Sequence, residues 1–274
     1  SNSPIGNNIL LVATNGDFIW LGGESGILQV NQLNEDKVFL NSGKNLPKDA
    51  VSSLFYQNGI LWIGTSKSGI YKYDTKSGVI TSFFKGQNSI SNSINYLTGD
   101  RDNLYVATKN GIFIINISTG ERYHYSTLNG LPHNDIEHIF LDSENRLLFA
   151  TRTNGIYEIN VRGEVEDYFT VGKYELDFNS IAQDVNGNIW VSTYGQGIFL
   201  LMPDSVVNLT VANGLKSNYC YSLIATDSLY LWVGHRLGLS RIEINSHTAS
   251  VYDADKGITG DCNLNAALLS KDND

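Results

Sequence analysis

Apolar residues along this chain occur in short runs that often alternate with polar positions, and Gly, Asn, Asp or Ser separates one run from the next. Four such runs lie between residues 51 and 84, at 51–56, 60–65, 70–74 and 79–84. Alternation with many β-branched and aromatic residues is typical of β-strands, and the separating residues favour turns. No run of ten or more residues has helical periodicity, so the pattern predicts an all-β chain.

One phrase returns six times at a spacing of 42 or 43 residues. Its fixed point is a small residue, at Gly22, Gly64, Ala107, Ala150, Ser192 and Gly234. Two residues earlier stands a large apolar one, at Trp20, Trp62, Tyr105, Leu148, Trp190 and Trp232. A glycine follows a few residues later, at Gly26, Gly69, Gly111, Gly155, Gly197 and Gly238. Such regularity indicates an array of identical supersecondary units.

Four short strands and four connections account for one repeat, which predicts a β-propeller of four-stranded antiparallel blades. We expect one domain over residues 9–270, with six blades at about 9–40, 51–84, 94–125, 136–170, 179–211 and 219–253. Residues 262–270 read as the first strand of a seventh unit, which predicts a fragment of a seven-bladed propeller. Residues 1–3 are interpreted as the remainder of an expression tag.

Blade packing explains two of the repeated positions. A residue lying beneath the neighbouring blade must be small, and the large residue two positions earlier points to the same face of its strand. We therefore expect the four tryptophans to fill the gaps between blades as core residues. Cys220 and Cys262 lie 42 residues apart. We expect two free, buried thiols, with a disulfide as the alternative in an oxidising compartment.

Composition excludes several functional classes. The net charge is −9 and no basic stripe is present, so nucleic acid is not expected as a partner. No apolar run approaches the ~20 residues that cross a bilayer. Turns such as 184–188 faintly resemble a calcium loop, but similar turns at 100–103 and 142–145 favour hairpins. We expect no catalytic residues, no metal and no cofactor, because no nucleophile elbow, phosphate loop or zinc-ligand set is found.

The loops between the second and third strands offer the candidate ligand-binding residues. The repeat dictates the glycine of each loop, whereas the residues before it vary and are free to serve recognition. They include cations, an amide and an aromatic ring, which suit sugar hydroxyls, carboxylates and stacking. The candidates are Lys67, Lys109, Arg152, Tyr194, Gln196, His235 and Arg236. Tyr96, Tyr219 and Tyr221 lie on or beside inner strands and either reach the central channel or pack in the core.

The repeat phrase itself resembles the two-component regulator propeller. The residues that carry the resemblance are Leu61-Trp62-Ile63-Gly64-Thr65, Gly69-Ile70, Tyr73-Asp74 and the connector 129–136, and it extends over residues 9–270. It implies the periplasmic sensor region of a hybrid two-component system, which is an inner-membrane receptor whose histidine kinase and phosphorelay parts lie outside these residues. The small-residue changes at Ala107, Ala150 and Ser192, and His235 in place of Thr, cast little doubt on the fold.

Three hypotheses about function remain open. The first is a sensor module that responds to oligosaccharides from polysaccharide breakdown. The second is a scaffold propeller that binds no ligand and holds a homodimer of the same receptor. The third, a propeller glycosidase or lyase, has the least support, because few carboxylates lie on the inner strands and glycosidases need a facing pair. We therefore expect that this chain is not itself an enzyme.

Overall fold

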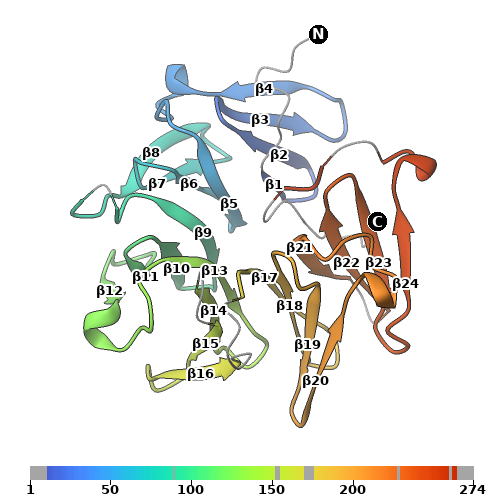
Figure 1. Cartoon of the computed structure of the whole chain (residues 1–274). Coiled ribbons are helices and arrows are strands. Elements are labelled where there is room, and N and C mark those ends of the chain that lie inside the picture. The colour runs from blue at the N-terminus through green and yellow to red at the C-terminus, as the bar shows by residue number, and fades with distance from the viewer. Residues whose placement is uncertain are drawn as a thin grey trace. The chain divides into compact units, whose positions relative to one another are not determined.

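The computed structural model describes residues 11–88, 90–151, 155–169, 176–226, 229–258 and 261–263. Every strand within these residues belongs to one of six four-stranded sheets, and in each sheet the strands lie side by side in chain order (Figure 1). Neighbouring strands pair antiparallel. The six sheets are the blades of a β-propeller, which confirms the predicted all-β class and four strands per repeat.

The chain divides into two compact units, and the first ends at Ile139. This unit holds three whole sheets. Their strands are β1 (Leu11–Thr14), β2 (Phe18–Gly23), β3 (Gly26–Asn31), β4 (Lys37–Leu40), β5 (Val51–Gln57), β6 (Ile60–Thr65), β7 (Ile70–Asp74), β8 (Val79–Phe84), β9 (Ile94–Gly99), β10 (Asn103–Thr108), β11 (Gly111–Asn116) and β12 (Arg122–Tyr125). Single 3₁₀ turns follow β4 and β12, at η1 (Ser42–Lys44) and η2 (Thr127–Asn129).

The second unit begins at Phe140, inside the first strand of the fourth sheet. The strands of the last three sheets include that first strand, whose residues 136–139 belong to the first unit. They are β13 (Ile136–Leu141), β14 (Leu147–Thr151), β15 (Gly155–Ile159), β16 (Val165–Phe169), β17 (Phe178–Gln183), β18 (Ile189–Thr193), β19 (Ile198–Met202), β20 (Ser205–Leu209), β21 (Cys220–Ala225), β22 (Tyr230–His235), β23 (Gly238–Glu243) and β24 (Ala249–Tyr252). The turns η3 (Val211–Asn213) and η4 (Ala254–Lys256) follow the last two sheets.

In the first two repeats the small residue lies against the next sheet, as the sequence predicts. A Cβ built on Gly22 would meet Leu54 of β5 at 3.2 Å, and one on Gly64 would meet Ile94 of β9 at 2.7 Å. Within each unit the first strand of one sheet packs against the first strand of the next, β1 against β5, β5 against β9, and β17 against β21. The repeat therefore keeps this position small so that consecutive sheets can stack.

Gly64→Ala is expected to lower the free energy of unfolding by about 1–3 kcal/mol, because the added methyl overpacks the contact with Ile94. Gly22→Ala is the matched comparison, since its nearest contact is 3.2 Å rather than 2.7 Å and leaves more room. Chemical denaturation of both variants tests this. Equal destabilisation of the two would contradict the packing explanation.

The tryptophan positions are largely core, as expected. Trp20, Trp62 and Trp190 are buried, and Trp232 is half-buried. The Trp20 ring stacks on Tyr56 of the next sheet with centroids 5.2 Å apart. This contact confirms that a tryptophan fills the space between two blades.

The recurring glycine is required by backbone conformation. Gly111 has φ +97°, in the region that side chains rarely adopt, and a Cβ there would overlap the carbonyl oxygen of Tyr125 at the end of β12. Equivalent glycines at 26, 69, 197 and 238 face the last residue of their own fourth strands in the same way. The glycine thus lets the loop before the third strand close onto the outer edge of the blade.

The end of the chain is only partly described. Residues 264–270 of the predicted extra strand lie outside the described residues, and 261–263 carry no strand. Even so, the Cys262 amide donates to the His235 carbonyl at 3.0 Å, and Cys262 lies over Gly234 as Ile94 lies over Gly64. Cys220 and Cys262 are both free thiols, the first buried and the second half-buried.

Candidate ligand-binding surface

Three tyrosines converge where the fifth and sixth sheets meet in the second unit. Tyr194 follows β18, Tyr219 precedes β21 and Tyr221 lies on β21. The Tyr194 ring centroid lies 4.9 Å from that of Tyr219 and 5.8 Å from that of Tyr221. Tyr194 is 53% exposed and Tyr219 is 49% exposed. We call Tyr194, Tyr219 and Tyr221 the tyrosine cluster.

Backbone hydrogen bonds hold the cluster in place. Tyr194 and Tyr219 form an isolated antiparallel bridge, and the Tyr194 amide donates to the Asp177 carbonyl at 2.9 Å. The Gly195 amide donates to the Asn218 carbonyl at 3.1 Å. The loop after β18 is therefore tied to the connection that enters β21, and the exposed rings are positioned before any ligand arrives. Such preorganisation lowers the entropic cost of binding.

Charged side chains border the cluster. Arg236 Nε lies 3.9 Å from Asp261 Oδ2, and the Leu237 amide donates to Asp261 Oδ1 at 3.0 Å. The Arg236 side chain is 74% exposed, so its guanidinium remains available to solvent. Burial raises the pKa of Tyr221, the Tyr194 phenol raises it further and Arg236 opposes the rise. These side chains therefore share one electrostatic environment.

The arrangement suits a polyhydroxylated ligand. Exposed aromatic rings can stack on the C–H face of a sugar, and the phenols, the guanidinium and the carboxylate together supply donors and acceptors for hydroxyl groups. A cluster of large side chains that stays exposed on a folded protein is typical of a binding surface.

The structure brings two of the seven predicted residues, Tyr194 and Arg236, to this surface. Gln196 is exposed on the loop of Tyr194. Its backbone carbonyl accepts a hydrogen bond from the side chain of Asn208 of β20. Lys67 and Lys109 are exposed in the first unit. Arg152 lies outside the described residues.

His235 has a structural position rather than an exposed one. In four other repeats a threonine hydroxyl donates to the carbonyl of the recurring glycine, at Thr65, Thr108, Thr151 and Thr193. His235 takes that place in the sixth repeat and is fully buried. Its Nδ1 lies 3.1 Å from the Tyr219 carbonyl and its Nε2 lies 2.9 Å from Ser240 Oγ. His235 therefore supports the backbone of the tyrosine cluster.

Sequence reasoning did not single out Asp261. Asp135 and Asp177 stand directly before the first strands of the fourth and fifth sheets, and Asp261 occupies the same position of the sequence repeat. This recurring acidic position is the signal that could have found Asp261. Only the folded chain shows that its carboxylate reaches the loop of the preceding sheet.

Residues 175–195 match the sequence profile of the two-component regulator propeller. The chain resembles that family. The matched stretch contains β17, β18, Trp190 and Tyr194, so both the core tryptophan and one cluster residue lie in a recognised regulator propeller repeat. The match confirms the resemblance that the repeat phrase indicates.

The proteins that this chain matches are larger. Histidine kinase P4 of Formosa agariphila is 24% identical over 281 residues, which cover 94% of this chain and 20% of the kinase. The extracellular domain attributed to the hybrid two component system BT4673 from B. thetaiotaomicron superposes with TM-score 0.77 at 20% identity, over 96% of this chain and 38% of that one. The chain thus spans well under half of either protein.

Virginiamycin B lyase from Staphylococcus aureus also superposes, with TM-score 0.76 and 17% identity over 92% of this chain and 87% of the lyase. At such identities the structural likeness establishes the propeller fold alone. This chain is a β-propeller similar to extracellular regions of hybrid two-component systems. Among the described residues, no helix is long and apolar enough to cross a membrane.

Proposed function

We propose that this regulator propeller is a periplasmic sensor module of a membrane-anchored two-component receptor, and that the tyrosine cluster contacts an oligosaccharide. The exposed cluster of Tyr194 and Tyr219 beside Arg236 carries the proposal. These residues lie in loops that the repeat leaves free, whereas the surrounding template serves packing. The resemblance to regulator propellers supports the sensor part, and the chemistry of the cluster supports the carbohydrate part.

Signalling in this proposal follows from differential binding. A ligand shifts a receptor only if it binds one arrangement more tightly than another. The cluster joins the loop of the fifth sheet to the entrance of the sixth, so a bound ligand would brace that junction. The propeller itself carries out no catalysis in this account, and the kinase reaction belongs to other parts of the receptor.

Tyr194→Ala is expected to weaken oligosaccharide binding about 10-fold, since a central aromatic contact of this kind is worth about 1–2 kcal/mol. Isothermal titration calorimetry against a panel of oligosaccharides from polysaccharide digestion measures the loss. Tyr123→Ala is the control, because Tyr123 is also exposed, at 56%, but lies on β12 in the first unit. Unchanged affinity in Tyr194→Ala, or an equal loss in the control, would refute the assignment.

A scaffold role is the second candidate, because Tyr194, Tyr219 and the 51%-exposed Leu237 also suit a protein partner. Sedimentation velocity of the unchanged chain and of Tyr194→Ala measures the oligomeric state and distinguishes the scaffold proposal from the sensor proposal. The scaffold proposal predicts a dimer that this substitution dissociates and no oligosaccharide binding. The sensor proposal predicts that sugar affinity, rather than self-association, depends on Tyr194.

A further inference from the structure

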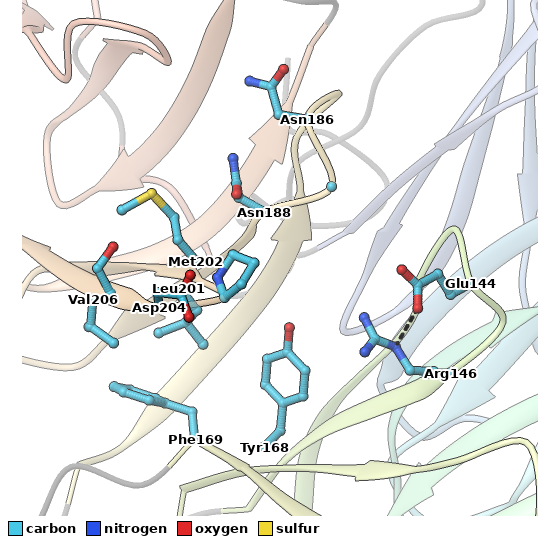
Figure 2. Close-up of a pocket in the computed structure, with 13 residues that line it drawn as sticks. Glu144, Arg146, Tyr168, Phe169, Asn186, Asn188, Leu201, Met202, Asp204 and Val206 are labelled. Carbon is cyan, nitrogen blue, oxygen red and sulfur yellow. Dashed lines mark ion pairs between the residues drawn. The ribbon is translucent and has the colours of Figure 1, made fainter.

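A pocket of about 820 Å³ opens between the fourth and fifth sheets (Figure 2), and among the described residues none of the candidates predicted from the sequence lines it. It is bordered by the turns that precede β14 and β18 and by the turn between β19 and β20. Asn188 of the pocket precedes β18, whereas Tyr194 follows it. The pocket and the tyrosine cluster therefore lie at opposite ends of that strand.

The pocket combines an apolar floor with polar walls. Figure 2 shows Glu144 and Arg146 on one side, Met202 and Asp204 on the other, and the Tyr168 ring between them with its hydroxyl directed into the space. Phe169, Leu201 and Val206 add apolar surface, while Asn186 and Asn188 add amides. A volume of this size with a few polar groups fits a small organic ligand.

Arg146 is the one cation among the described residues of the pocket wall, and it is already neutralised. Arg146 Nη2 lies 2.7 Å from Oδ2 of Asp142, whose side chain is fully buried. The Arg146 Nε atom lies 3.6 Å from Glu144 Oε2 and 3.7 Å from Glu158 Oε2. Across the pocket, Asp204 has no ion-pair partner within the described part of the chain. Carboxylates therefore outnumber cations here, and the local potential favours a positive ligand.

The surroundings of Glu158 also favour a positively charged ligand. Glu158 pairs with Glu166 across β15 and β16, so two acids face each other beside Arg146. Burial raises the pKa of Glu158, Arg146 lowers it, and Glu166, Asp142 and Glu144 raise it again. An additional cation near these carboxylates would relieve their mutual repulsion, whereas an anion would add to it.

We propose that this pocket binds an organic cation, an ammonium group carried on a body with an apolar face. The ammonium lies between Glu144 and Asp204, and the body packs on Tyr168, Phe169 and Met202. Aromatic rings beside a cation add a further attraction through their π-faces. This site is separate from the tyrosine cluster and does not depend on the sensor proposal.

Two matched probe pairs test the proposal, each an amine with its neutral counterpart: 2-phenylethylamine with 2-phenylethanol, and glucosamine with glucose. Protein NMR titration at millimolar concentration should show binding by at least one amine and weaker binding by its counterpart, with shifted resonances in residues 186–188 and 201–206. Glu144→Gln and Asp204→Asn should each weaken amine binding about 2- to 5-fold, as expected for partly exposed ion pairs. The double variant should lose about 10-fold.

Asp17→Asn is the control variant, because it removes one exposed carboxylate that lines no part of the pocket. It should leave amine affinity unchanged. The proposal is overturned if neither amine binds, if each neutral counterpart binds as tightly as its amine, or if the double variant keeps the affinity of the unchanged protein. If surface charge alone attracted the amines, Asp17→Asn would lower the affinity as much as the pocket variants do, and that result would also overturn the proposal.

Discussion

Trp190→Ala is expected to lower the free energy of unfolding by about 3–5 kcal/mol, the usual cost of emptying a large aromatic site in a core. Trp190 is fully buried and packs in one cluster with Leu215, Cys220 and Leu223, which lie in or before the sixth sheet. Its Nε1 donates to Asp184 Oδ2 at 2.9 Å. The substitution therefore leaves a cavity between two sheets and deprives a buried carboxylate of a donor. Urea unfolding of the purified chain measures the loss.

Trp190→Phe separates these two contributions. Phenylalanine keeps an aromatic ring in the cavity but cannot donate to Asp184, so we expect a loss of about 1–3 kcal/mol. The remaining donors to Asp184 among the described residues are the backbone amides of Asn186 and Asn188, at 2.9 and 3.0 Å from Oδ1, and the Asn188 side-chain amide, at 3.3 Å from Oδ1 and 3.2 Å from Oδ2. If Trp190→Ala were no worse than Trp190→Phe, packing between the sheets would not be the main role of this residue.

Acid is expected to destabilise the first unit through His138. Burial lowers the pKa of His138 to about 3, from 6.5 in an exposed histidine. The ring lies 4.0 Å from the Tyr96 ring, and Nδ1 has no hydrogen-bond partner among the described residues. In the unfolded chain this histidine is protonated below about pH 6.5, whereas in the folded chain it stays neutral down to about pH 3. The free energy of unfolding therefore falls as the pH drops through this interval. Between pH 7 and pH 4 the loss from this group is about 3 kcal/mol.

His138→Phe should remove this part of the pH dependence while keeping an aromatic ring against Tyr96. The measurement is urea unfolding at pH 7 and pH 4 for both proteins, and the quantity to compare is the difference between the two pH values. His235 offers an internal replicate, because burial lowers its pKa to about 4 and Lys216 adds to the effect against the Tyr219 carbonyl. His235→Thr restores the residue found in other repeats. Equal acid sensitivity in all three proteins would contradict this explanation.

Much of the fold could be predicted because its determinants are local and recur. Three positions recur at one spacing: the glycine that closes the loop, the small residue under the next sheet and the large apolar residue two positions before it. Six copies of this pattern all predict the same four-stranded blade. The acid-rich turns connect neighbouring antiparallel strands, as the hairpin interpretation predicts. The carboxylate of Asp184 accepts amides of its own turn, as does that of Asp142.

The candidate sites were predicted less completely, for physical reasons. Tyr194 and Arg236 could be named as candidates from the sequence because the repeat leaves their positions free. His235 was predicted as a further ligand-binding residue, and it stands where other repeats have a threonine. Only the strand register shows that this position is buried. The sequence did not predict the pocket near Arg146, because its residues come from turns of two different sheets. No local pattern marks residues that only blade stacking brings together.

NMR of the chain with ring-labelled tyrosine tests the central claim most directly, because all 15 tyrosines then report on ligand contact in one titration. The account predicts that an oligosaccharide from polysaccharide digestion shifts the signals of Tyr194 and Tyr219 and leaves that of Tyr123 in place. Shifts confined to tyrosines outside the cluster, or no shift with any oligosaccharide of the panel, would contradict it.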